Sequence, residues 1–351
     1  MEAVALRRAL LAHYRRHARD LPWRRTGDPY AIWISEIMLQ QTQVKTVIPR
    51  FGRFLRQFPS VAALAAAQET TVCEAWAGLG YYRRARNLHR AARQIMRDHD
   101  GEMPGTAASL RTLAGIGDYT ASAIASIAFG ERVAAVDGNL VRVLARLLAL
   151  PGSASDARLH RTVRELAQRL VDCDRPGEVN QALMDIGATV CRPGSPQCHA
   201  CPLASHCAAR RDGNPGLHPG KKVRAVRRRL CIAFAWIERD GGVVLEQRPL
   251  DGLWAGLWEL PSAQGTAAKK DLAKRLRIPV GRKIATVKHD LTHRRVEASV
   301  YHVACARPTR KLGRTWQDPI AAPLSSLARK AILAVRGAAP ALSRRKPARF
   351  T

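Results

Sequence analysis

The segment Cys191–Cys207 reads CRPGSPQCHACPLASHC and holds four of the protein's eight cysteines in a single short loop. The spacing is C-x6-C-x2-C-x5-C, and the remaining cysteines stand singly along the chain. Crowding of this kind predicts a metal site rather than disulfides. Four thiolates suit either a tetrahedral zinc ion or an iron–sulfur cluster, which spacing alone separates poorly. The usual structural zinc pattern pairs two C-x2-C units across a longer gap, and this loop lacks it.

The charge of the chain points to a polyanionic partner. Its 351 residues include 58 Lys and Arg against 28 Asp and Glu, a formal net charge of +30. Neutralising phosphates releases condensed counterions, so a surface this basic favours nucleic acid; a halo of solvating charge is the alternative. No apolar stretch approaches the ~20 residues that cross a bilayer, so we expect no membrane association and a cytoplasmic, nucleoid-associated protein.

The pattern of apolar residues divides the chain into two parts. Residues 4–203 repeat apolar side chains at helical spacing, which predicts an all-α region over residues 1–209. Residues 210–229 are rich in Gly, Pro and positive charge, which is typical of a linker. An α/β domain is expected over 230–337, with strands at 230–237, 243–247, 284–289 and 296–304, a hairpin turn at 239–242 and a helix at 267–276. A basic, disordered tail is expected over 338–351.

The stretch from Leu113 to Ala121 reads LAGIGDYTA and resembles the helix–hairpin–helix motif. In that motif Gly115 and Gly117 would form a turn whose backbone N–H groups approach a DNA phosphate closely. An alanine-rich helix follows over 120–129, and then Asp137 stands at the start of another predicted helix. An acid at that position has an ordinary role as an N-cap, which the residues alone favour.

Several segments are closely similar to MutY-type adenine DNA glycosylases of the endonuclease III superfamily. They are the cysteine loop, SEIMLQQTQ at 35–43, LPWR at 21–24 and GLGYYRRARNL at 78–88. The resemblance implies a six-helix barrel over about 24–135, with the helix–hairpin–helix at 109–129. It also implies that the N-terminal helix and residues 136–209 form a [4Fe–4S] module. The cluster ligands would be Cys191, Cys198, Cys201 and Cys207.

Two carboxylates carry the predicted chemistry. Glu36 lies in an apolar helical segment, and burial among such neighbours raises the pKa of a glutamate towards the range where it donates a proton. Adenine leaves poorly until a ring nitrogen is protonated, so Glu36 is the expected general acid. The resemblance implies that Asp137 stabilises the cation that develops at C1′ of the extruded nucleotide. On the sequence alone, Glu36 could equally be an ordinary helix surface residue.

Position 119 separates two reaction types within the superfamily. Lyase-type relatives carry a lysine there that attacks C1′ as an amine nucleophile, whereas this chain carries Tyr119. A phenol forms no Schiff base, so we expect base removal by water, an abasic product and a Tyr119 that assists Asp137. The resemblance further implies that Gln41 and Tyr81 wedge into the duplex, and that Arg24 and Asn139 build the nucleotide pocket. Each of these could otherwise be a packing or solvent-facing residue.

The second domain resembles a Nudix hydrolase that lacks its catalytic carboxylates. Residues 247–261 read like the approach to a Nudix box, but the following helix offers KKDLAKR where acidic Mg²⁺ ligands belong. The domain is therefore expected to recognise DNA rather than to hydrolyse pyrophosphate. In the family a loop of the form aromatic-Ser-His reads 8-oxoguanine, and HDLTH at 289–293 matches it through Thr292 and His293. Leu291 stands where an aromatic residue is usual, and a plain turn between strands is the alternative.

Together these features predict a monofunctional adenine DNA glycosylase, a hydrolase of base excision repair with a [4Fe–4S] cofactor. The expected partner is double-stranded DNA with A·8-oxoguanine or A·G mispairs, bound by a monomer; other repair proteins are possible partners. Two alternatives stay open. One is an endonuclease III-like glycosylase and lyase for oxidised pyrimidines, and the other is a non-enzymatic iron–sulfur DNA-binding protein.

Overall fold

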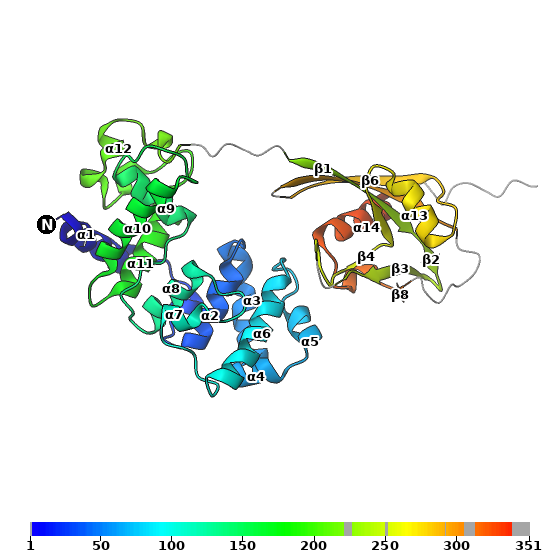
Figure 1. The fold of residues 1–351 in the computed structure, drawn as a ribbon, viewed down its shortest axis with the longest axis horizontal. Coiled ribbons are helices and arrows are strands. Elements are labelled where there is room, and N and C mark those ends of the chain that lie inside the picture. The colour runs from blue at the N-terminus through cyan, green and yellow to red at the C-terminus, as the bar shows by residue number, and fades with distance from the viewer. Residues whose placement is uncertain (1, 221–226, 250–251, 292, 305–312, 339–351) are drawn as a thin grey trace, which may run out of the picture. The chain divides into compact units, whose positions relative to one another are not determined.

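The structure is a computed structural model that describes residues 2–220, 227–249, 252–291, 293–304 and 313–338. The chain forms two compact units, which divide inside the predicted linker at residue 223, and the short segment 80–83 is assigned to the second unit. Figure 1 shows the first unit as helical and the second as strands with helices. None of the described helices is long and apolar enough to cross a membrane.

The first unit is all-α in its described residues, as predicted. Figure 1 labels its helices. They are α1 (Glu2–His17), α2 (Pro29–Leu39), α3 (Val44–Gln57), α4 (Val61–Ala66), α5 (Glu69–Ala75), α6 (Arg83–Asp98), α7 (Ala107–Leu110), α8 (Asp118–Ala128), α9 (Gly138–Leu147), α10 (Ala157–Val171), α11 (Pro176–Asp185) and α12 (Ala208–Arg211). Short turns of helix are η1 (Pro22–Arg24), η2 (Ile186–Val190), η3 (Cys198–Ala200), η4 (Ala204–His206) and η5 (Pro215–Leu217).

Side-chain caps set the starts of several of these helices. The carboxylate of Asp28 accepts hydrogen bonds from the N–H groups of Tyr30 and Ala31, and Pro29 occupies the first helical position of α2. Asp137 caps α9 in the same way, and Asp156 caps α10. The positions at which α2 and α9 begin therefore follow from local sequence, and these two helices carry the predicted acids.

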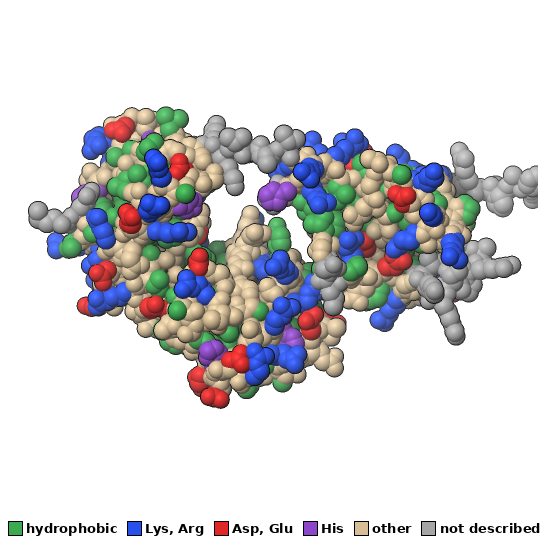
Figure 2. Space-filling model, in the orientation of Figure 1, with side chains coloured by type: hydrophobic (Ala, Val, Ile, Leu, Met, Phe, Trp, Pro, Cys, Tyr) green, Lys and Arg blue, Asp and Glu red, His purple; other side chains and the backbone are tan. Residues whose placement is uncertain are grey.

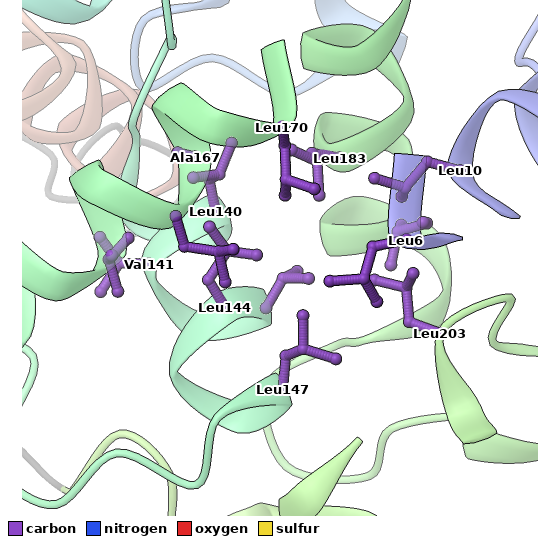
Figure 3. Packing of buried hydrophobic residues seen from close by; sticks show 14 of the residues in the cluster. Leu6, Leu10, Leu140, Val141, Leu144, Leu147, Ala167, Leu170, Leu183 and Leu203 are labelled. Atoms are coloured by element: carbon purple, nitrogen blue, oxygen red, sulfur yellow. The ribbon is translucent and has the colours of Figure 1, made fainter. Parts of the chain in front are cut away.

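One hydrophobic core joins the N-terminal helix to the C-terminal helices of the unit. Leucines of α1, α9, α10 and α11 meet there, and Figure 3 shows Leu6 and Leu10 of α1 facing the same interior as Leu144 of α9. Cysteine side chains of the metal loop pack against this core, and Leu203 of the same loop is part of it. Burial of these apolar side chains thus anchors the cysteine loop to α9.

The first part of the predicted linker is not a free tether. The imidazole Nδ1 of His218 lies 2.8 Å from the carbonyl oxygen of Leu150. The Gly220 N–H donates to the carbonyl oxygen of Gly152 at 2.8 Å. Residues up to Gly220 therefore pack on the loop between α9 and α10. Glycine and proline are common in both linkers and tight turns, so composition alone does not show where a linker packs on a neighbouring loop. Residues 221–226 lie outside the described part of the chain.

The second unit has the predicted α/β character. Its strands are β1 (Arg228–Trp236), β2 (Glu238–Arg239), β3 (Gly242–Gln247), β4 (Trp258–Glu259), β5 (Ser262–Gln264), β6 (Lys283–Asp290), β7 (Arg294–His302) and β8 (Arg314–Trp316). One sheet has the order β5-β1-β7-β6, with β1 and β7 parallel. The other has β2-β3-β4, with β8 also paired to β3. The helical elements are α13 (Ala268–Leu276), η6 (Pro319–Ala321) and α14 (Ser326–Ala338).

Side chains of β1 alternate between two cores. Ile232, Phe234 and Trp236 pack with residues of α14, whereas Ala233 and Ala235 pack with residues of α13. Since successive side chains of a strand point to opposite faces, the sheet carries one helix on each side. This alternation is why both faces of β1 are apolar.

The hairpin at residues 239–242 joins different strands from those predicted. We expected the turn to join strands 230–237 and 243–247 as partners. Instead β3 pairs with the two-residue strand β2, with Arg239 opposite Gly242. The long strand β1 belongs to the other sheet, between β5 and β7. Turn chemistry identifies a reversal of the chain but does not decide which sheet a long strand joins.

Candidate active site

Glu36 is a carboxyl group inside a buried, mostly apolar helix. Every residue of α2 from Tyr30 to Met38 is buried, so the acid has no route to solvent along its own helix. Only 6% of Glu36 is exposed. Burial, together with the negative charge of Asp137, raises the pKa of Glu36 to about 7, while a hydrogen bond from Tyr119 and the charge of Arg24 oppose that rise. A carboxyl with such a pKa is about half protonated at neutral pH and can donate its proton.

Tyr119 connects Glu36 to the opposite side of the site. The phenol lies in the first turn of α8, forms a hydrogen bond with Glu36 and has its oxygen 3.7 Å from the sulfur of Met184 on α11. Burial and the neighbouring carboxylates raise its pKa well above the usual value, so the phenol stays protonated. Helix α8 packs directly on α2, which places the phenol beside Glu36, and the charge of Asp137 acts on it as well. The predicted assistance of Tyr119 to Asp137 stays a prediction.

Asp137 is both an N-cap and a charged neighbour of Glu36. One carboxylate oxygen accepts the N–H of Leu140 at 2.7 Å, and the other accepts the amide Nδ2 of Asn139 at 2.8 Å. Its negative charge acts on Glu36 and on Tyr119. The capping role and the electrostatic role therefore occur together: the cap holds the carboxylate in place at the mouth of α9.

Asn180 supports the loop that precedes Asp137. The side chain is fully buried on α11 and accepts the N–H of Ala135 at 3.0 Å. Its amide donates to the carbonyl oxygen of Val133 at 3.0 Å and to the hydroxyl of Ser126 at 2.8 Å. Asn180 was not predicted from the sequence. The only signal was an amide side chain within an amphipathic helix, because its partners lie more than forty positions away in the chain.

Arg24 forms a two-pronged ion pair with Asp185. Its Nη1 and Nη2 lie 2.7 Å and 2.9 Å from the two carboxylate oxygens, and its guanidinium lies over the ring of Tyr14, 5.4 Å from the centroid. The charge of Arg24 also acts on Glu36. The residue predicted to build the nucleotide pocket is thus held rigidly beside the acid. Asp185 was not identified from the sequence.

The four predicted metal ligands line one cavity. It has a volume of about 410 Å³ including its open mouth, and Cys191, Cys198, Cys201 and Cys207 all border it. Burial raises the pKa of Cys201 to about 11 and also raises that of Cys207, and the other cysteines add to both rises. Clustered thiols of this kind favour the thiolate form only when a metal supplies positive charge.

The donor set of this cavity fits an iron–sulfur cluster. Within the described residues, no group of three or more His, Cys, Asp or Glu side chains is placed to hold a metal ion. Four soft thiolates around a cavity are what a [4Fe–4S] cluster needs, since each cysteine ligates a different iron. Arg146 is buried beside the cavity and donates Nη1 to Cys191 Sγ at 3.4 Å.

Arg142 links the cysteine loop to Asp137. Its Nε donates to the carbonyl oxygen of Cys191 at 2.9 Å, and its Nη2 donates to Asn139 Oδ1 at 3.0 Å. Asn139 in turn donates to Asp137. Asn139 is therefore held by Arg142 on one side and by Asp137 on the other. The residue predicted to contact the nucleotide thus also connects the cysteine loop to Asp137.

Comparison with known proteins identifies the family. Residues 34–171 match the model of the HhH-GPD superfamily of base excision DNA repair proteins, and residues 232–334 match the NUDIX domain model. The chain is 37% identical to the adenine DNA glycosylase of Homo sapiens, over 86% of this chain and 67% of the human protein. It is 32% identical to that of Schizosaccharomyces pombe, over 75% of this chain and 70% of the relative. The chain belongs to the adenine DNA glycosylase family.

Members of this family are DNA N-glycosylase hydrolases, which agrees with the predicted enzyme class. The chain is 40% identical to the Arabidopsis thaliana adenine DNA glycosylase, over 74% of this chain and 48% of that protein, so it spans about half of that relative's length. Among solved structures, a thermostable thymine-DNA glycosylase matches with a TM-score of 0.55 and 30% identity, over 60% of this chain and 97% of that one. An endonuclease III in a DNA complex matches with a TM-score of 0.51 at 22% identity, over 60% of this chain and 97% of that one, and confirms the fold.

In this family member, the predicted wedge residues both have left-handed backbone. Gln41 is exposed, with φ of 56°, and Tyr81 is 61% exposed, with φ of 48°. Non-glycine residues in that region are strained and concentrate at functional sites. Arg84 stabilises both turns at their bases, because it donates to the carbonyl oxygens of Met38 and Leu79 at 2.9 and 3.0 Å.

The predicted hairpin turn requires glycine at one of its two positions. Gly115 has φ of +80°, and a Cβ there would lie 2.7 Å from the Cβ of Asn87. Gly117 instead has φ of −96° and open space where a Cβ would stand, and it precedes α8 as its N-cap residue. The first backbone N–H groups of a helix have no partner within the helix, so those at the start of α8 can bind an anion such as a phosphate.

The predicted lesion-reading loop connects β6 and β7. Leu291 is partly buried against the core of the second unit, and its N–H donates to the carbonyl oxygen of Arg294 at 2.8 Å. His293 is exposed, and Thr292 lies outside the described residues. Helix α13, at the position of a Nudix helix, carries Lys269 and Lys270 and a single acid, Asp271. Figure 2 shows Lys and Arg side chains over the visible face of each unit.

Proposed function

We propose that this protein removes adenine from DNA in which adenine is mispaired with 8-oxoguanine or guanine, and leaves an abasic site. The observation that carries this proposal is the buried carboxyl of Glu36, whose pKa is raised to about 7 beside the charged Asp137, so that about half of it is protonated at pH 7. The names of the curated relatives specify adenine. The identity of the opposite base rests on the Nudix-like domain and on His293, which matches the family's lesion loop.

Glu36 supplies the proton that makes adenine a leaving group. The proton moves from its carboxyl to a ring nitrogen of the extruded base, and the electron pair of the glycosidic bond leaves with the base. Tyr119 orients the Glu36 carboxyl through its hydrogen bond. Only 6% of Glu36 is exposed, so few water molecules compete with the base for its proton.

Asp137 stabilises the cation that forms at C1′. Its carboxylate is fixed by the N–H of Leu140 and the amide of Asn139, so its field needs no rearrangement as charge develops. Water then adds to C1′ and returns a proton to the Glu36 carboxylate, so hydrolysis is balanced and the enzyme is restored. With Tyr119 in place of an amine nucleophile, no Schiff base forms and the strand stays intact.

Cys191, Cys198, Cys201 and Cys207 would hold a [4Fe–4S] cluster. The cluster would stabilise the loop and present it to DNA, with no part in bond cleavage. The cysteines line a cavity that includes neither Glu36 nor Asp137, which supports a role outside the chemical step. Arg142 and Asn139 connect their loop to Asp137. The DNA partner is supported by the net charge of +30.

The experiment uses the full chain and a duplex with one adenine opposite 8-oxoguanine. We expect free adenine to be released, with the labelled strand breaking only after alkali. Glu36→Gln should lower the single-turnover rate at least about 100-fold and keep the dissociation constant for the duplex, because the change removes a proton but keeps the shape. Glu165→Gln, an exposed change on α10, is the matched control.

Two outcomes would overturn the proposal. Strand breakage without alkali would favour the endonuclease III-like lyase, and binding without any base release would favour the non-enzymatic protein. A duplex with cytosine opposite 8-oxoguanine should yield no free base, which checks that adenine is the base removed.

A further inference from the structure

Asp185 is a buried carboxylate with two arginines and no direct place in the chemistry described so far. It is the last residue of α11, and its side chain is 8% exposed. Arg24 contacts both of its oxygens, and Arg19 donates Nε at 2.7 Å and its backbone N–H at 3.2 Å. A buried carboxylate with two arginine partners goes beyond what the end of a helix requires, so the arrangement calls for another explanation.

The position of Arg24 explains why this pair matters. Its side chain is 12% exposed, and it lies in η1, which packs against α2. The charge of Arg24 reaches Glu36 and acts against its protonation. An arginine without a partner there would pair with the Glu36 carboxylate and favour its ionised form, which cannot donate a proton.

We propose that Asp185 is a positioning residue for base excision: it holds Arg24 in an ion pair that offsets part of its positive charge, so that Glu36 stays able to carry a proton. This inference deepens the proposed function and rests on Glu36 being the acid. Asp185 touches neither Glu36 nor the reacting atoms in any contact of the described residues. It acts through the guanidinium, whose two nitrogens it fixes.

The charges around the two carboxyls make the direction of the effect clear. Glu36 faces Arg24 from η1, Tyr119 from α8 and Asp137 from the start of α9. Asp185 faces Arg24 and Arg19, with Tyr14 and His13 of α1 nearby. Burial acts to raise the pKa of Asp185, but the hydrogen bonds and charges of the arginines lower it overall, so Asp185 stays ionised.

The first experiment replaces Asp185 with Asn and measures the titration of Glu36 directly. Carbon NMR of protein labelled at the glutamate carboxyls reports each titration, and the Glu36 signal is the one that Glu36→Gln removes. We expect the midpoint of Glu36 to fall by about one pH unit in Asp185→Asn, since an unpaired cation nearby has at least that effect. From a midpoint of about 7, the protonated share at pH 7 then falls about fivefold.

The second readout is the pH profile of single-turnover adenine release. Asp185→Asn should lower the rate about fivefold at pH 7 and restore it at lower pH, whereas simple loss of structure would lower it at every pH. Asp185→Glu keeps the charge and should keep the wild-type midpoint. Asp174→Asn removes an exposed partner of Arg132 and serves as the control that leaves the profile unchanged.

A double variant keeps the test decisive if Asp185→Asn folds poorly. Arg24→Gln combined with Asp185→Asn removes both charges and keeps an amide pair of similar shape. Its Glu36 midpoint should return to the wild-type value or rise above it. An unmoved midpoint in Asp185→Asn, or a lowered midpoint in the double variant, overturns the role of Asp185. The titration needs no DNA, so a shifted midpoint with no adenine release would count against the proposed function alone.

Discussion

Glu36 should make the folded protein less stable as the pH rises, and Glu36→Gln should remove that loss. A carboxyl in an unfolded chain has a pKa near 4.5, whereas burial raises the pKa of Glu36 to about 7 in the folded protein. Between these values the folded state holds a proton that the unfolded state releases. Stability therefore falls with rising pH across this window.

The size of this effect follows from the pKa difference. Each pKa unit corresponds to about 1.4 kcal/mol, so a shift from 4.5 to about 7 corresponds to about 3 kcal/mol. Below pH 4.5 both states hold the proton and no penalty exists; above pH 7 the full penalty applies. Glutamine keeps the shape and carries no charge at any pH. The variant should thus gain about 3 kcal/mol over the wild type at pH 8, relative to their difference at pH 4.

Urea unfolding followed by circular dichroism at a series of pH values measures this difference. The wild type and Glu36→Gln share their other titrating groups, so the difference between their unfolding free energies isolates Glu36. Parallel curves, with a constant difference from pH 4 to pH 8, would refute the reasoning. They would mean that Glu36 is solvated in the folded protein and that the acid must be sought elsewhere.

Two further predictions concern the hairpin turn and the cysteine loop. Gly115→Ala should lower the unfolding free energy by about 1–3 kcal/mol, because it strains a left-handed backbone and meets Asn87, whereas Gly117→Ala should be nearly neutral. Urea unfolding of both variants checks this, and equal losses would contradict it. Cys201→Ser should lose the brown colour and the iron, about four atoms per chain in the wild type, because one ligand of a shared cluster is gone. Cys73→Ser, outside the loop, should keep both in iron analysis and visible absorption, and a colourless wild-type protein with bound zinc would contradict the cluster.

The architecture was predictable because the signals that define it are local. Helical periodicity separated residues 1–209 from an α/β region, and cap residues such as Asp137 marked where helices begin. The cysteine spacing and the segment around Glu36 led to the family. Composition did not reveal that residues up to Gly220 pack on the loop between α9 and α10, because Gly and Pro mark turns as well as linkers. The hairpin at 239–242 was predicted for the wrong pair of strands.

The sequence by itself determined which residue types are available for the chemistry: an acid in an apolar helix, a capping aspartate, a tyrosine in place of a lysine and four clustered thiols. Only the tertiary structure decided their electrostatics. Tyr119 forms a hydrogen bond with Glu36, Asn180 holds the loop before Asp137, and Asp185 pairs with Arg24. Asn180 lies 45 positions from its partner Ala135, and Asp185 lies 161 positions from Arg24. The physical reason is that a pKa depends on burial and on charges brought near by folding, and neither is written in the neighbours along the chain.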